Sequence, residues 1–179
     1  VTTVRDTGNI DPKLLEQFKQ GQEHWPRWFG AGRILDGDPP GPWKWVQAVG
    51  SPAAAREAVP QVIDEGVNFL KTYVMITPEI LQAIVNEAHS RGVWVTSHVG
   101  HLTTVEEAVR IGVDSLEHVR VGPELVPDAD REAFEGLRAR TWDPLVSWMS
   151  WRFADPASDR AGRLIELMAE RGVIMTPTL

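Results

Sequence analysis

The chain repeats one junction, in which a helix-like pattern ends at a Gly-Val pair and a short apolar run follows. The junction occurs in the segments DEGVNFL, SRGVWVT, RIGVDSL and ERGVIMT. Glycine suits the residue that follows a helix, because its backbone enters the left-handed region without steric cost. Valine favours the start of a strand. The glycines expected to end helices are Gly66, Gly92, Gly112 and Gly172.

The segments before these glycines have the apolar spacing of helices. In TPEILQAIVNEAHSRG, Thr77 is the expected N-cap and Pro78 the first helical residue. TTVEEAVRIG has the spacing of a capping box, and SDRAGRLIELMAERG is also amphipathic. SPAAAREAVPQVIDEG is helical too, but Pro60 lies inside it. Since an interior proline costs about 3 kcal/mol, we expect a kink or a break there.

Apolar runs after these helices predict strands. The expected strands are residues 1–5, 32–35, 67–73, 93–98, 114–119 and 173–178. Strands that alternate with helices indicate an α/β fold with a parallel sheet and helices outside it. A doubly wound open sheet and a (β/α) barrel both satisfy this order. No Gly-rich phosphate loop follows a strand, which weakens the dinucleotide-binding alternative.

Two long stretches interrupt this alternation. Residues 6–31 predict a loop with a helix and contain His24, while residues 120–157 carry Trp142, Trp148 and Trp151. Both stretches follow strands, which would place them on the carboxyl face of a barrel, where active sites of this fold lie. The tryptophans either wall a pocket there or pack the stretch onto the barrel.

Composition narrows the class of partner. The chain has 179 residues, of which 42% are apolar and 24% charged, as expected for one globular domain with its own core. The net charge of -7 argues against nucleic acid or an anionic membrane surface as partner. Zero cysteines exclude disulfides and thiolate metal sites, and leave the compartment open.

One strand carries an unexpected charge. In NFLKTYV, Lys71 stands among apolar and aromatic residues. Three interpretations are open: a lysine on an edge strand that faces water, an amine nucleophile, or an amine converted into a group that binds metal.

Two histidines occupy comparable positions on the next strands. His98 ends the fourth expected strand, and His118 is near the end of the fifth. Parallel strands in register bring such positions to one rim, so Lys71, His98 and His118 are expected to converge. A lone strand-end histidine is more often a hydrogen-bonded structural residue. Together, two neutral imidazoles indicate a site for zinc or a related divalent ion.

The motifs VTTVRD, GVNFLKTY, VTSHVGH, GVDSLEHV and MTPTL resemble the amidohydrolase superfamily, closest to its imidazolonepropionase-like and Xaa-Pro-dipeptidase-like branch. This resemblance implies a (β/α)8 TIM barrel with one or two divalent metals, zinc above all. It implies that Lys71 is a carboxylated bridging lysine and that His98 and His118 bind the second metal. Tyr73 and His101 would contact a small-molecule substrate, whose amide bond a metal-activated hydroxide would attack.

The same resemblance predicts that residues 1–179 form a partial barrel of six of eight βα units, strands two to seven. The His-x-His pair of the family would precede Val1, and its catalytic aspartate would follow Leu179, so no general base is present. The isolated chain is then expected to be inactive, and its open sheet edges favour a homo-oligomer. Rival hypotheses are a metal-free Schiff-base enzyme that uses Lys71, and a non-catalytic binding or scaffold protein. Arg5 and Asp6 are structural or line the pocket, and His89 is expected to face solvent.

Overall fold

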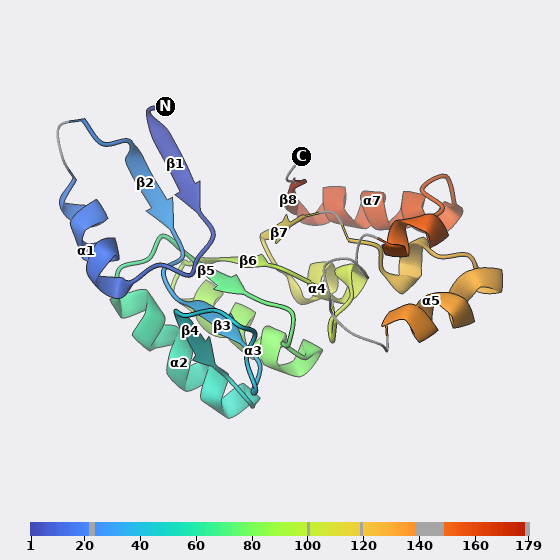
Figure 1. Cartoon of the computed structure of the whole chain (residues 1–179), viewed down its shortest axis with the longest axis horizontal. Coiled ribbons are helices and arrows are strands. Elements are labelled where there is room, and N and C mark those ends of the chain that lie inside the picture. Colours follow the sequence, from blue (N-terminus) through green and yellow to red (C-terminus); the bar gives the residue numbers. More distant parts are fainter. Residues whose placement is uncertain (22–23, 100, 119, 139–148, 178–179) are drawn as a thin grey trace.

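The chain forms parallel strands and helices in alternation (Figure 1). The computed structural model describes all residues except 22–23, 100, 119, 139–148 and 178–179. The strands are β1 (Thr3–Asp6), β2 (Arg27–Gly30), β3 (Ile34–Asp36), β4 (Val46–Ala48), β5 (Phe69–Thr72), β6 (Trp94–Ser97), β7 (Ser115–Glu117) and β8 (Ile174–Thr176). The α-helices are α1 (Pro12–Gln20), α2 (Pro52–Asp64), α3 (Pro78–Ser90), α4 (Val105–Ile111), α5 (Arg131–Arg138) and α7 (Asp159–Arg171). Short 3-10 helices are η1 (Pro123–Leu125), η2 (Asp128–Asp130) and η3 (Ser150–Phe153).

The strands make two parallel sheets. The larger has the order β4-β3-β5-β6-β7-β8, and β1 pairs with β2 in the smaller. Each of the six strands expected from the sequence is present, which confirms the α/β class with a parallel sheet. β2 and β4 were not expected, and β4 takes the place beside β3. The count of six βα units out of eight therefore stays a prediction.

Helices α2, α3 and α4 cover one face of the larger sheet with an apolar core. Leu70, Val95 and Leu116 project from three adjacent strands into this core and are fully buried. Ile84 of α3 and Val59 of α2 meet them from the helical side. Successive side chains of a strand alternate between the two faces of a sheet. The residues next to Leu70, Val95 and Leu116 along each strand therefore point to the opposite face.

The local signals for helix ends are confirmed. Thr77 caps α3, and Thr104 and Glu107 form the capping box of α4. The glycines of all four Gly-Val junctions have positive φ, between 66° and 104°. The break expected at Pro60 is absent, since α2 runs unbroken to Asp64. Burial of its apolar face against the core offsets the cost of the interior proline.

The two long stretches contain more regular structure than expected. Within residues 6–31, Phe18 of α1 stacks on Trp28 with ring centroids 5.5 Å apart and also contacts Trp25, so these aromatic residues pack the stretch together. The second stretch contains η1, η2, α5 and η3. Trp142 and Trp148 lie outside the described residues. Among the residues that are described, no helix is both long and apolar enough to cross a membrane.

Candidate functional site

Polar side chains gather on the sheet face that points away from the helices. We call Lys71, Tyr73, Thr96, His98, Ser115 and Glu117 the inner-face residues, and all of them are buried. They come from β5, β6 and β7 and the residues that directly follow β5 and β6. The register pairs Lys71 with Thr96, and Thr96 with Ser115. Since alternate residues of a strand share a face, these polar groups lie side by side.

The two histidines are in contact. The ring centroids of His98 and His118 are 4.5 Å apart. His118 follows Glu117, so simple alternation would send its side chain to the opposite face. Its backbone has φ 65°, in the left-handed region, and this turn returns the ring to His98. A non-glycine residue in this backbone conformation costs about 1 kcal/mol of conformational free energy. Residues strained in this way are concentrated at functional sites.

Lys71 lies deeper in the sheet than the histidines. Its register partner is Thr96, two residues before His98. β5 lies between β3 and β6, and Lys71 is only 3% exposed, so the interpretation as a solvated edge lysine is wrong. Its Nζ has no hydrogen-bond partner among the described residues. Burial lowers the pKa of Lys71 to about 7, against the opposing charge of Glu117.

Glu117 is held by a buried network that the sequence did not predict. Arg5 forms an ion pair with it at 2.6 Å, and the Thr96 hydroxyl donates to the same carboxylate oxygen at 2.7 Å. Arg5 also donates to Ser115 at 3.2 Å. Burial favours the neutral acid, but these hydrogen bonds and the charge of Lys71 outweigh it, so the pKa of Glu117 is lowered. Arg5 therefore lines the site, which the sequence left open.

The aromatic ring of Tyr73 lies next to the ring of His98 and next to that of Trp43. Its ring lies 4.6 Å from that of His98 and 5.4 Å from Trp43. Burial raises the pKa of the Tyr73 phenol above its usual value. Near neutral pH the phenol therefore remains protonated and available as a hydrogen-bond donor. The contact of Tyr73 with a substrate stays a prediction.

Arg120 lies against His98, and the interpretation of the sequence did not identify it either. Its Nε lies 3.1 Å from His98 Nε2, and a terminal nitrogen lies 2.5 Å from the same atom. Burial lowers the pKa of His98 to about 2, and the charges of Arg120, Lys71 and His118 add to this effect. His98 is therefore neutral. The one available sequence signal was a basic residue two positions after His118.

The remaining histidines lie elsewhere. His89, on α3, is exposed and pairs with Asp114 at 2.9 Å, so it is not simply solvated. His101 lies in the segment between β6 and α4 and is partly buried, and its contact with substrate stays a prediction. His24 is exposed. Asp6 accepts a hydrogen bond from the backbone of Gly8 and is partly buried.

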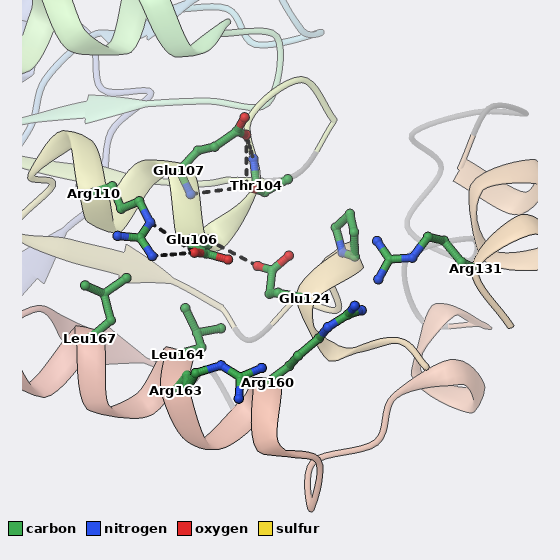
Figure 2. A pocket seen from close by; sticks show the side chains of 11 residues that line it. Thr104, Glu106, Glu107, Arg110, Glu124, Arg131, Arg160, Arg163, Leu164 and Leu167 are labelled. Atoms are coloured by element: carbon green, nitrogen blue, oxygen red, sulfur yellow. Dashed lines mark hydrogen bonds and ion pairs between the residues drawn. The ribbon is translucent and has the colours of Figure 1, made fainter. Parts of the chain in front are cut away.

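Two pockets lie near these elements. A cavity of about 260 Å³ is lined by Thr96 and Ser115 of the inner face and by Arg5, Phe69, Trp94, Ile174 and Thr176, and its lining includes neither Lys71 nor the two histidines. A larger pocket of about 580 Å³ lies between α4, η1 and α7 (Figure 2). It contains arginines and glutamates, with Glu124 buried beside the backbone of Glu106, and none of the candidate site residues that the sequence predicted. Its groups belong to the helical layer, so we assign the chemistry to the inner face.

The inner face supplies donors suited to a divalent metal. Among the described residues, no group of three histidine, cysteine, aspartate or glutamate side chains is placed to hold a metal ion. However, two imidazoles are in contact, and a buried amine near them has no partner. If that amine of Lys71 carried a carboxylate, the set would contain nitrogen and oxygen ligands of the kind that zinc accepts. The residues therefore fit a metal through their donor chemistry.

Solved structures similar to this chain are hydrolases. A protein from Bifidobacterium longum described as a prolidase has a TM-score of 0.57 and 29% identity, over 77% of this chain and 36% of that one. A Xaa-Pro dipeptidase with methionine bound in its active site has a TM-score of 0.56 and 22% identity, over 98% of this chain and 53% of its own. Ochratoxinase of A. niger has a TM-score of 0.61 and 18% identity, over 98% and 52%.

The chain spans about half the length, or less, of these structures. No family model and no curated protein matches the sequence.

Proposed function

We propose, from a fold that this chain shares with prolidases and amidohydrolases of the amidohydrolase superfamily, that it is the central part of an enzyme that hydrolyses amide bonds in small substrates. The observation that carries the proposal is the buried amine of Lys71, which has no hydrogen-bond partner among the described residues and lies on the same face as two touching imidazoles. Such a group is costly to bury, and a site that uses it offers a reason for its presence.

Lys71 is the residue we assign to carboxylation. With a pKa of about 7, a large fraction of its amine is neutral near neutral pH. The neutral amine adds carbon dioxide and releases one proton to give a carbamate. The carbamate is an anion with two oxygen ligands, and it takes the place of the lysine ammonium cation. His98 and His118 would hold a divalent ion through their ring nitrogens. When bound, such an ion lowers the pKa of water and polarises a substrate carbonyl.

Tyr73 is suited to orient the substrate. Its protonated phenol lies beside His98 and can donate a hydrogen bond to a carbonyl or carboxylate oxygen. Trp43, partly exposed and edge-on to Tyr73, offers an apolar wall for the leaving group. Similar structures described as a prolidase and a Xaa-Pro dipeptidase favour a dipeptide as the substrate class.

The experiment uses the full-length protein with His98→Ala, His118→Ala and Lys71→Ala. Metal content and hydrolysis of a panel of dipeptides and N-acyl amino acids are measured. We expect each variant to lose bound metal and nearly all activity. His89→Ala is the matched control, because His89 lies on the outside of α3 and pairs with Asp114. A wild-type protein without divalent metal, or equal loss in the control, would contradict the proposal.

A second candidate function rests on the same amine. A lysine with a pKa near 7 is nucleophilic at neutral pH and suits a Schiff base with a carbonyl substrate. Borohydride reduction in the presence of such a substrate would link it covalently to Lys71. The two adjacent imidazoles favour the metal-dependent hydrolase.

A further inference from the structure

The guanidinium of Arg120 contacts one ring nitrogen of His98, the atom Nε2. Its Nε and one terminal nitrogen lie 3.1 Å and 2.5 Å from His98 Nε2. A guanidinium has only donors, so Nε2 must be the acceptor and the proton of the neutral ring is on Nδ1. This contact therefore fixes the tautomer of His98.

A metal and Arg120 cannot use His98 at the same time. An imidazole nitrogen has one lone pair, so a metal bound to Nε2 replaces the guanidinium directly. A metal bound to Nδ1 would move the ring proton to Nε2, where it would face the N–H groups of Arg120. Either mode of binding breaks the contact between Arg120 and His98.

The local charge adds to this competition. Arg5 and Arg120 are permanent cations, and Lys71 is a third when protonated. Glu117 is the acidic inner-face residue, and its carboxylate is already paired with Arg5. An incoming divalent ion therefore meets a cationic surrounding, and Arg120 is the cation in direct contact with the candidate ligand.

We propose that Arg120 is a placeholder cation, which holds His98 in the metal-free protein and must be displaced when metal binds. The inference rests on the proposed function, because it takes His98 as a metal ligand. Arg120 would thereby weaken metal affinity while keeping the His98 ring oriented. This makes Arg120 a positioning residue that acts through His98.

The test is a zinc titration of the metal-free full-length protein against a competing chelator. We expect Arg120→Gln to bind zinc about tenfold more tightly than the wild type, since it removes the competitor and its charge. Arg91→Gln is the matched control: the exposed Arg91 pairs with the partly buried Glu87 of α3, and its replacement should leave zinc affinity unchanged. Equal or weaker binding by Arg120→Gln overturns the inference alone. Absence of zinc binding in both wild type and variant overturns the proposed function as well.

A second measurement needs no variant. Phenylglyoxal modifies exposed guanidinium groups, and peptide mass spectrometry reports each arginine separately. We expect zinc to accelerate modification of Arg120, because the displaced group leaves its half-buried position on His98. Modification of Arg91 should not change. A rate at Arg120 that zinc leaves unchanged or slows would overturn the inference, even if Arg120→Gln failed to fold.

Discussion

Burial of the Lys71 amine makes this group reactive and also lowers the free energy of unfolding. Its amine is buried and has no hydrogen-bond partner within the described part of the chain, so we expect Lys71→Met to stabilise the metal-free protein by about 1–4 kcal/mol at pH 7. The folded pKa of about 7 lies below the unfolded value of 10.5. Between pH 10.5 and 7 the unfolded chain binds a proton that the folded chain does not, so wild-type stability falls as pH falls through this window and then levels.

The advantage of Lys71→Met should therefore be larger at pH 7 than at pH 10. Urea unfolding in buffers free of carbon dioxide measures it. An advantage that is the same at both pH values would show that the amine is not buried in its neutral form. The same variant should bind no metal.

Glu117 should matter for stability through Arg5 and Thr96. Glu117→Gln is expected to cost about 1–3 kcal/mol, a reduced figure because the Arg5 side chain is 38% exposed. Since the pKa of Glu117 is lowered below 4.5, its contribution is present above pH 4.5 and is lost as pH falls through the folded value. The variant should show a flatter acid limb in unfolding curves. Glu87→Gln, at an exposed pair on α3, should change stability by less than about 0.5 kcal/mol.

Residue positions were predictable only where the signal was local. Lys71 and His98 stood out because a charge and an imidazole interrupt apolar strands. Glu117 and Arg120 did not, because an acid or a base beside a strand has the same pattern whether it is solvated or buried. The partner of Glu117 is Arg5, which lies near the start of the chain and far from Glu117 in sequence, and no local pattern could connect them.

Two glycines in different elements should respond in opposite directions to the same substitution. Gly92 follows α3 with φ 70°, and Gly162 lies within α7; both have open space where a Cβ would be placed. Gly92→Ala should destabilise by about 1 kcal/mol through backbone strain alone. Gly162→Ala should stabilise by about 0.5–1 kcal/mol, because alanine is the better helix former. Thermal unfolding of the pair checks this, and shifts of equal sign would contradict it.

Helices and long strands were predictable because caps and periodicity act within a few residues. Thr77, the capping box at Thr104 and the Gly-Val junctions each placed an element end correctly. β2 and β4 were missed because they have four and three residues and no clear alternation. Their pairing with β1 and β3 forms them, and such pairing is decided by tertiary contacts.

At the scale of the whole molecule, the described sheet has two unpaired edges, at β4 and β8. Ile174 on β8 is 52% exposed and shares a pocket with Phe69 and Trp94. We expect the isolated 179-residue chain to self-associate through this edge, and Ile174→Lys to reduce association. Ile165→Lys, on the outside of α7, is the matched control and should have little effect. Analytical ultracentrifugation measures both; equal effects would exclude the β8 edge as the contact.

The α/β class with a parallel sheet was predictable from the alternation of elements, whereas a closed barrel was expected only from the resemblance and stays a prediction. Alternation needs only the order of helices and strands along the chain. Closure depends on which strand meets β4 and which meets β8, and neither pairing leaves a pattern inside residues 1–179. The similar solved structures are about twice as long as this chain.

The division of the sheet into a polar inner face and an apolar face under the helices has a consequence for evolution. Neighbouring residues of one strand have separate roles. Leu70 packs in the core under the helices, whereas Lys71 lies on the inner face. Mutations on the inner face can change its polar groups while Leu70, Val95 and Leu116 keep the helices attached. A library randomised at Tyr73 alone would therefore vary the inner face while the core under the helices keeps its packing.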